Sequence, residues 1–363
     1  MKKSTRIAEK IEGETIATGL DLGDKVSYFC VLGPHGKILR EDRVGTTPGA
    51  LRKVFGVGDN KGLIALEAGT HSPWVSRLLE ELGHEVAVAN PARLRLIFDS
   101  PFKNDRADAR SLARLARMDR ELLHEIEHRS EEAQADLAVV RSRDTLVRTR
   151  TSLINHIRGA VKSFGARVGK GPTEGFILKA AEAIPPALRG ALDPVLQTIS
   201  GLNVTIKRLD GEISRLGRTK YPETRRLQEV HGVGPLISLA FVLTLEDPAR
   251  FAKSRAVGAF LGLVPRRDQS GSSDPQKRIT KRGDSLMRRL LVQSAQRILG
   301  PFGEDSDLRR FGLRIASHGG KNGKKRAITA VARKLAVLLH RLWRSGDAYM
   351  PLFASERAAQ PAT

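Results

Sequence analysis

The amino-acid sequence predicts an α/β domain at the amino terminus, followed by two mainly helical regions. From residue 15 to about residue 120, short apolar runs typical of strands alternate with helical segments. From about residue 128 to 218 the sequence becomes helical and basic, and from residue 222 onward apolar helical segments predominate. We therefore expect a basic tail at 1–14, an α/β domain at 15–125, a helical or coiled-coil region at 126–220, a mainly α domain at 221–348 and a second tail at 349–363.

The expected α/β domain has five strands. TIATGLDLG is the first strand, and KVSYFCVLG and KILREDRVG form a hairpin joined across PHGK. A helix then begins at Pro48 with Thr47 as its cap, followed by the strand KGLIALEAG, the helix SPWVSRLLEELG and the strand HEVAVAN. A three-stranded meander followed by alternating helix and strand is the layout of an RNase H-like fold. Other α/β folds share it, so the assignment depends on where the acidic residues fall.

The middle region carries a seven-residue apolar repeat, which predicts a long helix packed on another helix. The partner helix lies either in a second chain or in the same chain at 201–217, and the sequence leaves both open. Polar residues at the other positions of the seam argue against a strict coiled coil. The repeat consists of Val140, Val147, Ile154 and Val161.

A glycine turn introduces the carboxy-terminal region. Gly232 and Gly234 precede the apolar segment PLISLAFVL, a pattern typical of a helix-hairpin-helix, whose backbone N–H groups would hold a DNA phosphate. The same residues also fit a turn between two core helices, and His231 before them fits a surface residue. Further along, Asp284 is expected to cap the helix SLMRRLLVQSAQRIL, and a last helix extends to about Leu342.

The net charge points to a polyanionic partner. Lys and Arg number 62 against 40 Asp and Glu, a formal charge of +22 in 363 residues. Such an excess repels itself on the surface unless nucleic acid or another polyanion is bound. The basic residues are spread along the whole chain, which disfavours a membrane anchor.

Cysteine content and hydropathy suggest a cytoplasmic location. The only cysteine, Cys30, lies in an apolar run and is expected to be a small core residue. We find no apolar run of about 18 residues and no secretory signal, so we expect no membrane span.

Four acidic residues fall where an RNase H-like sheet would bring them together. Asp21 lies in the first strand and Glu67 closes the fourth, while Asp105 and Asp108 lie three apart on one helix face. Such a cluster is costly unless divalent cations bind to it, and oxygen ligands suit Mg²⁺ or Mn²⁺. Taken singly, each acid also fits a strand end, a cap or a solvated face. An actin-like ATPase would share GLDLG, but the sequence offers no convincing second phosphate hairpin.

The segment QSGSS at 269–273 lies in a loop with basic flanks. A serine that attacks a phosphodiester conserves bond energy as a covalent phosphoserine, and nearby cations offset the charge on phosphorus. Ser270 precedes a glycine that would let DNA approach closely. Residue types alone do not separate Ser270 from Ser272 or Ser273. The flanking cations, candidate DNA ligands, are Arg266, Arg267, Lys277, Arg278, Lys281 and Arg282.

Together these segments resemble the insertion sequence 110 family of transposases. The resemblance is carried by GLDLG, LEAGTHSPW, KNDRADARSLARLAR, RDTLVRTRTSLINHIRG, HGVGP and GLVPRRDQSG with ITKRGDSLMRR, over about residues 17–345. It implies a RuvC-like domain with a DEDD quartet at Asp21, Glu67, Asp105 and Asp108, and a transposase domain with its nucleophile at Ser270. It also implies a guide RNA from the same element, donor and target DNA, and a homodimer or homotetramer. Unlike many relatives, this chain has no glycine-rich run after the serine.

We therefore expect a Mg²⁺-dependent DNA transposase that cleaves and rejoins strands through a 5′- or 3′-linked phosphoserine. One alternative is a RuvC-like nuclease that hydrolyses branched DNA, for which Asp21→Asn would be inactive and Ser270→Ala active. Another is a non-catalytic DNA- or RNA-binding protein, for which neither substitution matters. Steep salt dependence of binding is expected of all three.

Overall fold

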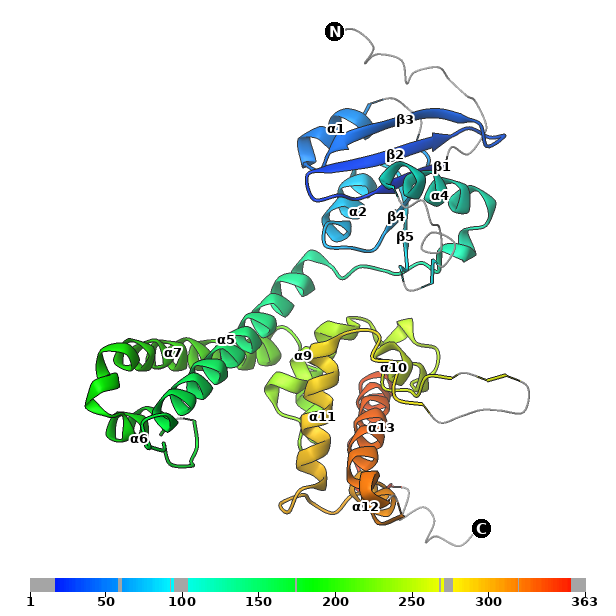
Figure 1. Cartoon of the computed structure of the whole chain (residues 1–363). Coiled ribbons are helices and arrows are strands. Elements are labelled where there is room, and N and C mark those ends of the chain that lie inside the picture. Colours follow the sequence, from blue (N-terminus) through cyan, green and yellow to red (C-terminus); the bar gives the residue numbers. More distant parts are fainter. Residues whose placement is uncertain are drawn as a thin grey trace, which may run out of the picture. The chain divides into compact units, whose positions relative to one another are not determined.

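The computed structural model describes residues 17–57, 61–91, 93–94, 104–173, 175–267, 269–270, 277–318 and 320–353. The chain divides into two compact units, Met1–Arg129 and Ser130–Thr363, each of which is described by itself (Figure 1). The expected tail at 1–14 lies outside the described residues, as does the expected second tail from residue 354 onward.

The amino-terminal unit is built on a mixed sheet of five strands in the order β3-β2-β1-β4-β5. β1 is antiparallel to β2 and parallel to β4, so the first and fourth strands are neighbours, as expected. This sheet with its flanking helices is consistent with the RNase H-like fold. The strands are β1 (Ala17–Asp21), β2 (Val26–Leu32), β3 (Ile38–Gly45), β4 (Leu63–Glu67) and β5 (Glu85–Ala89).

Helices cover both faces of this sheet because the central strands are apolar on both sides. Leu20 and Leu66 share one core with α1 (Pro48–Phe55) and α2 (Ser72–Glu81). Ala17 and Ala65, which point the opposite way, share another with α4 (Asp105–Met118) and the short helix η1 (Arg120–Leu123). Cys30 is fully buried against α4, as expected of a small core residue.

The carboxy-terminal unit is helical. Its two longest helices, α5 (Glu131–Lys162) and α7 (Arg189–Thr219), pack on each other within the chain. Arg143 of α5 contacts Asp210 of α7 at 2.8 Å, and Arg150 contacts Asn203 at 2.8 Å, so the two helices run antiparallel. The intramolecular hairpin left open by the seven-residue repeat is therefore present.

The described helices of this unit follow one another along the chain. They are α5 (Glu131–Lys162), α6 (Phe176–Ala183), η2 (Pro186–Leu188), α7 (Arg189–Thr219), α8 (Thr224–Leu227), α9 (Pro235–Leu245), η3 (Pro248–Arg250), α10 (Arg255–Phe260), α11 (Ser285–Leu299), α12 (Asp307–His318), η4 (Gly320–Asn322) and α13 (Gly323–Ser345). None of the helices in the described part of the chain is both long and apolar enough to span a bilayer.

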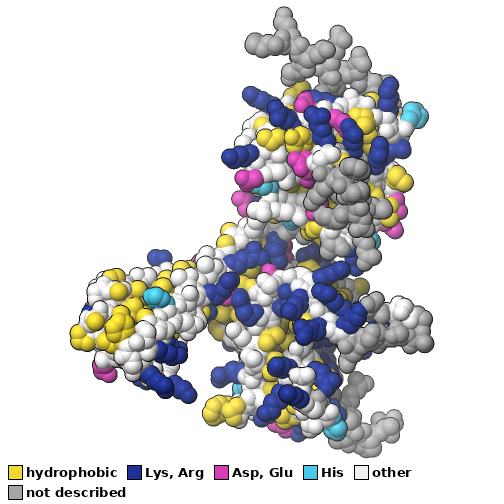
Figure 2. All heavy atoms as spheres, viewed as in Figure 1, with side chains coloured by type: hydrophobic (Ala, Val, Ile, Leu, Met, Phe, Trp, Pro, Cys, Tyr) yellow, Lys and Arg dark blue, Asp and Glu magenta, His cyan; other side chains and the backbone are white. Residues whose placement is uncertain are grey.

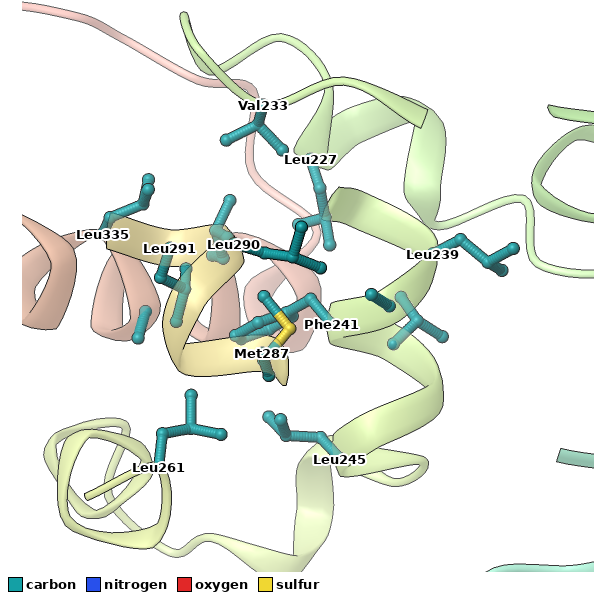
Figure 3. Packing of buried hydrophobic residues seen from close by; sticks show 14 of the residues in the cluster. Leu227, Val233, Leu239, Phe241, Leu245, Leu261, Met287, Leu290, Leu291 and Leu335 are labelled. Carbon is teal, nitrogen blue, oxygen red and sulfur yellow. The ribbon is translucent and has the colours of Figure 1, made fainter. Parts of the chain in front are cut away.

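The core of the carboxy-terminal unit is arranged around α9. This helix is apolar on every side, a composition typical of a helix surrounded by others, and its residues from 238 to 245 are all buried. Phe241 lies close to Met287 of α11, and Leu335 of α13 belongs to the same cluster (Figure 3). This core connects two segments of interest. The glycine turn, Gly232–Gly234, directly precedes α9, and the serine loop, residues 262–284, directly precedes α11.

Candidate active site

Two of the four acidic residues end neighbouring parallel strands. Asp21 is the last residue of β1 and Glu67 the last of β4, each directly after the paired residues Leu20 and Leu66. Parallel neighbours lie about 4.8 Å apart, and their carboxyl ends meet at one edge of the sheet. Both side chains are half-buried. Asp21 and Glu67 therefore emerge side by side from the sheet.

The face on which they emerge is the one covered by α4. Side chains alternate along a strand, so Asp21 points to the same side as Gly19 and Ala17. A Cβ added at Gly19 would overlap the backbone of Ala109 and Ala113, which shows that α4 lies directly on β1 there. Ala17 belongs to the same core cluster as Leu115 and Ala116, which lie farther along α4. α4 thus runs antiparallel to β1, with its amino-terminal end toward Asp21.

That end of α4 carries the other two acidic residues. Asp105 and Asp108 lie in the first turn, where negative charge interacts favourably with the helix dipole. The turn is capped by Asn104, whose Oδ1 accepts a hydrogen bond from the backbone N–H of Ala107 at 2.8 Å. Asp105 is exposed and Asp108 half-buried. The backbone therefore brings all four acids to one edge of one unit.

The side chains themselves do not form a closed metal site. Within the described residues, no three His, Cys, Asp or Glu side chains surround a common point. The oxygen-only donors and the close approach at Gly19 nevertheless suit a divalent cation, because side-chain rotation of these half-buried or exposed carboxylates requires no backbone movement.

The loops that follow the two acid-bearing strands are tied together by a histidine. His71 Nε2 lies 3.2 Å from Asp24 Oδ1 in the β1–β2 turn, and Trp74 Nε1 donates to His71 Nδ1 at 3.1 Å. Since Nδ1 accepts from Trp74, Nε2 is the ring nitrogen that faces Asp24 as a donor. We did not single out His71 from the sequence, although LEAGTHSPW contains it four residues after Glu67.

In the carboxy-terminal unit, the base of the serine loop is held by close backbone contacts. Pro265 bridges to Ile279, and the N–H of Arg266 donates to the carbonyl of Arg278 at 2.9 Å. Gly262 and Gly283 both have positive φ angles, 67° and 74°, and approach neighbouring backbone too closely for a Cβ. The loop therefore leaves the helical core at a fixed position.

Farther out, the loop presents Ser270 and a dense set of cations. Ser270 is exposed, as are the six flanking basic residues. Ser272 and Ser273 lie outside the described residues, so the choice among the three serines stays a prediction. The serine loop and the acidic residues belong to different units of the chain.

The glycine turn has a packing role that accounts for one of its two glycines. Gly232 has φ +85°, and a Cβ there would lie 3.2 Å from Ser294 O of α11. Gly234 caps α9 with open space around it, so phosphate binding by this helix end stays a prediction. His231 is mostly buried, and its Nδ1 lies 3.0 Å from Glu304 Oε1.

Comparisons with known proteins agree with this organisation. A model of the IS110-group DEDD transposases, described as Transposase, matches residues 18–165, and the model described as Transposase IS116/IS110/IS902 family matches residues 224–306. The transposase for insertion sequence element IS1111A of Coxiella burnetii is 27% identical, over 91% of this chain and 90% of that protein. The transposase for insertion sequence element IS1328 of Yersinia enterocolitica is 30% identical, over 77% of this chain and 82% of that protein. The chain belongs to the IS110 family of insertion-sequence transposases.

Proposed function

We propose that this transposase cleaves and rejoins DNA through a covalent phosphoserine at Ser270, with the four acids serving as its metal site. The single observation that carries the proposal is the convergence of Asp21, Glu67 and the first turn of α4 on one sheet edge. The exposed serine on a pinned, cationic loop supports it.

The serine supplies the nucleophile. Its Oγ forms a bond to phosphorus as the bond from phosphorus to one deoxyribose oxygen breaks, and the serine proton passes to solvent or to a nearby base. The departing oxygen takes up a proton and becomes a free hydroxyl. The hydroxyl of the exchanged strand then attacks the phosphoserine, which restores a phosphodiester and the serine.

The chain's own charges assist both steps. Arg266, Arg278 and Lys281 lie at the base of the loop, where they would offset the negative charge that develops on the phosphate oxygens. Asp21, Glu67, Asp105 and Asp108 would hold Mg²⁺ or Mn²⁺, which would supply positive charge to the scissile phosphate. The acidic and serine sites act together on one phosphate, from the same chain or from two.

Guide RNA and oligomerisation belong to the same proposal. They are supported by family membership and by a charge of +22, which exceeds what one short DNA contact needs. A transcript of the DNA flanking the gene should bind this chain more tightly than an unrelated RNA of equal length. Light scattering of the purified complex then gives the number of chains.

The decisive test uses a DNA substrate with a nick close to the cleavage site, so that the covalent intermediate is trapped. Wild-type chain should form a protein–DNA adduct that survives denaturing gels, and peptide mapping should locate it at Ser270. Ser270→Ala and Asp21→Asn should each form none while binding DNA with unchanged affinity. Ser285→Ala, at the start of α11, is the matched control and should form the adduct normally.

Two outcomes would overturn the proposal. Cleavage by Ser270→Ala without an adduct would support a hydrolytic nuclease. An adduct that persists in Ser270→Ala and maps to Ser272 or Ser273 would assign the nucleophile to another serine.

A further inference from the structure

A large groove crosses the carboxy-terminal unit beside the base of the serine loop. Its volume is about 1710 Å³, well above the roughly 300–1,000 Å³ of small-molecule pockets. The serine loop contributes Pro265, Lys277–Ile279 and Lys281 to its lining, and most of the other lining residues belong to α12, to α13 or to the segment after α13. A groove of this size suits a polymer.

The lining is strongly cationic. Ten lysine and arginine residues line the groove against one acidic residue, Asp307. Within the described part of the chain, no carboxylate pairs with the side chains of Arg278, Lys321, Lys325 or Arg333. Unneutralised cations at this density repel each other unless a polyanion binds. Figure 2 shows basic side chains covering much more of this unit's visible surface than acidic ones.

The cations on α13 are spread along the length of the helix. Lys325, Arg333 and Arg341 are eight residues apart, so each lies about 12 Å farther along the axis and about 80° around it from the one before. All three are exposed and line the groove. Positive charge distributed along about 24 Å of helix matches a phosphate backbone better than a single compact anion.

The floor between the cationic rims is apolar. It includes Phe311, Ile315, Val337 and Leu338, which are half-buried. Phe311 and Lys334 both line the groove, and Lys334 Nζ lies 4.0 Å from the centroid of the Phe311 ring, a cation–π contact that a stacking base would have to displace. In duplex DNA a groove-binding surface meets phosphates and base edges, whereas an unpaired strand also offers the flat faces of its bases to apolar and aromatic side chains.

We propose that this groove binds an unpaired DNA strand, with its phosphates along the α13 cations and its bases against the floor at Phe311. DNA is favoured over other polyanions because residues of the serine loop line part of the groove, so a bound strand would lie beside the loop that carries Ser270. The proposal concerns binding alone and stands whether or not Ser270 is the nucleophile. Its place in the molecule was missed from the sequence, where we followed only the apolar face of the last helix.

The test measures binding of the full-length chain to fluorescein-labelled dT15 and to a 15-base-pair duplex over a range of salt concentrations. Lys321→Gln combined with Lys325→Gln should weaken dT15 binding and lower the slope of log affinity against log salt by about 1.4, from about 0.7 for each lost phosphate contact. Lys207→Gln, an exposed lysine on α7 outside the groove, is the matched control and should change neither.

A second variant tests the floor. Phe311→Leu keeps an apolar side chain against α13 but removes the flat ring, so dT15 binding should weaken about fivefold or more while duplex binding is unchanged. Denaturation midpoints equal to wild type would confirm that both variants are folded.

Three results would overturn the proposal. The first is an unchanged salt slope in the double lysine variant. The second is an equal loss of dT15 and duplex binding in Phe311→Leu, which would make the groove a duplex contact. The third is a stronger effect of both variants on rU15 than on dT15, which would assign the groove to RNA.

Discussion

Replacing Gly19 with alanine should separate the two halves of the acidic site. Gly19 lies in β1 where α4 crosses it, two residues before Asp21. An added Cβ would lie 2.9 Å from Leu112 Cβ and closer still to the backbone of Ala109 and Ala113. The neighbours on α4 are mostly backbone, so they move only if the whole helix moves.

The size of the effect follows from this geometry. Ordinary Cβ contacts begin at about 3.4 Å, so α4 must retreat by about 0.5 Å from the 2.9 Å contact with Leu112 Cβ, and by more from the 2.0 Å contact with the carbonyl oxygen of Ala109. Overpacking of a core typically costs about 1–3 kcal/mol. The same retreat carries Asp105 and Asp108 away from Asp21, and a misplacement of about 1 Å in a catalytic group can cost on the order of 100-fold in rate. We therefore expect a larger loss of cleavage than of folding.

The two tryptophans allow each unit to be followed separately. Trp74 lies in the amino-terminal unit and Trp343 in the carboxy-terminal unit. In a Trp343→Phe background, urea unfolding followed by Trp74 fluorescence should shift to a lower midpoint for Gly19→Ala. The loss of cleavage rate is measured in single-turnover reactions on the nicked substrate, without urea, so that the unit is still folded.

Gly49→Ala is the matched control. It adds the same methyl group to the same unit, in α1, with nothing within 4 Å of the new Cβ, so neither measurement should fall. If Gly19→Ala unfolds at the wild-type midpoint and cleaves at the wild-type rate, α4 does not lie on β1 as described, and the convergence of the acids is wrong.

Three other predictions concern single side chains. Burial raises the pKa of the Cys30 thiol to about 12, so the native chain should resist thiol reagents at pH 8 and react only when unfolded. Burial lowers the pKa of His340, whose ring nitrogens lie 2.9 Å from Ser254 Oγ and Pro248 O. Protonation therefore favours the unfolded state. The free energy of unfolding of the carboxy-terminal unit should fall as pH drops below about 6.5, by up to about 1.4 kcal/mol per pH unit. Unfolding followed by Trp343 fluorescence should show this fall, and a free energy that does not change with pH would refute it. Lys281 has φ +56°, so Lys281→Gly should relieve about 1 kcal/mol of backbone strain while weakening DNA binding, and a lower melting temperature would contradict the first part.

Much of the amino-terminal unit follows from sequence pattern. The order of strands and helices and the hairpin were predicted, because alternation and turn residues are local signals. The adjacency of β1 and β4 was expected only from the RNase H-like fold, since no local pattern indicates which strands pair. The position of Asp21 and Glu67 at one sheet edge then follows from the topology. Gly19 was not singled out, since its role depends on a helix that begins 86 residues later and no local pattern reveals that contact.

The helical unit shows the same limit. The seven-residue repeat in α5 predicted a packed helix but did not identify its partner, because apolar seams of this kind are alike within and between chains. Asp144, a polar residue on that seam, pairs with Arg289 of α11 at 2.7 Å, which no spacing within α5 could indicate. In α13 the cations that line the groove lie on the same helix as a strongly apolar face. The apolar repeat is the stronger periodic signal, so the cations were not recognised as a group.

The base of the serine loop is held by hydrogen bonds to Arg288, whereas Ser270 is exposed, and this difference bears on how DNA is positioned. Arg288 of α11 donates hydrogen bonds to the carbonyls of Leu261, Arg282 and Gly283, so one core side chain holds both arms of the loop. A strand lying in the groove would then meet cations at a fixed place, while the exposed serine is carried beyond the region these contacts hold. If Ser270 is the nucleophile, as proposed, the positioning of the phosphate and the approach of the nucleophile belong to different parts of one segment. A substitution at Arg288 should then disturb both DNA binding and cleavage, whereas one at Ser270 should disturb cleavage alone.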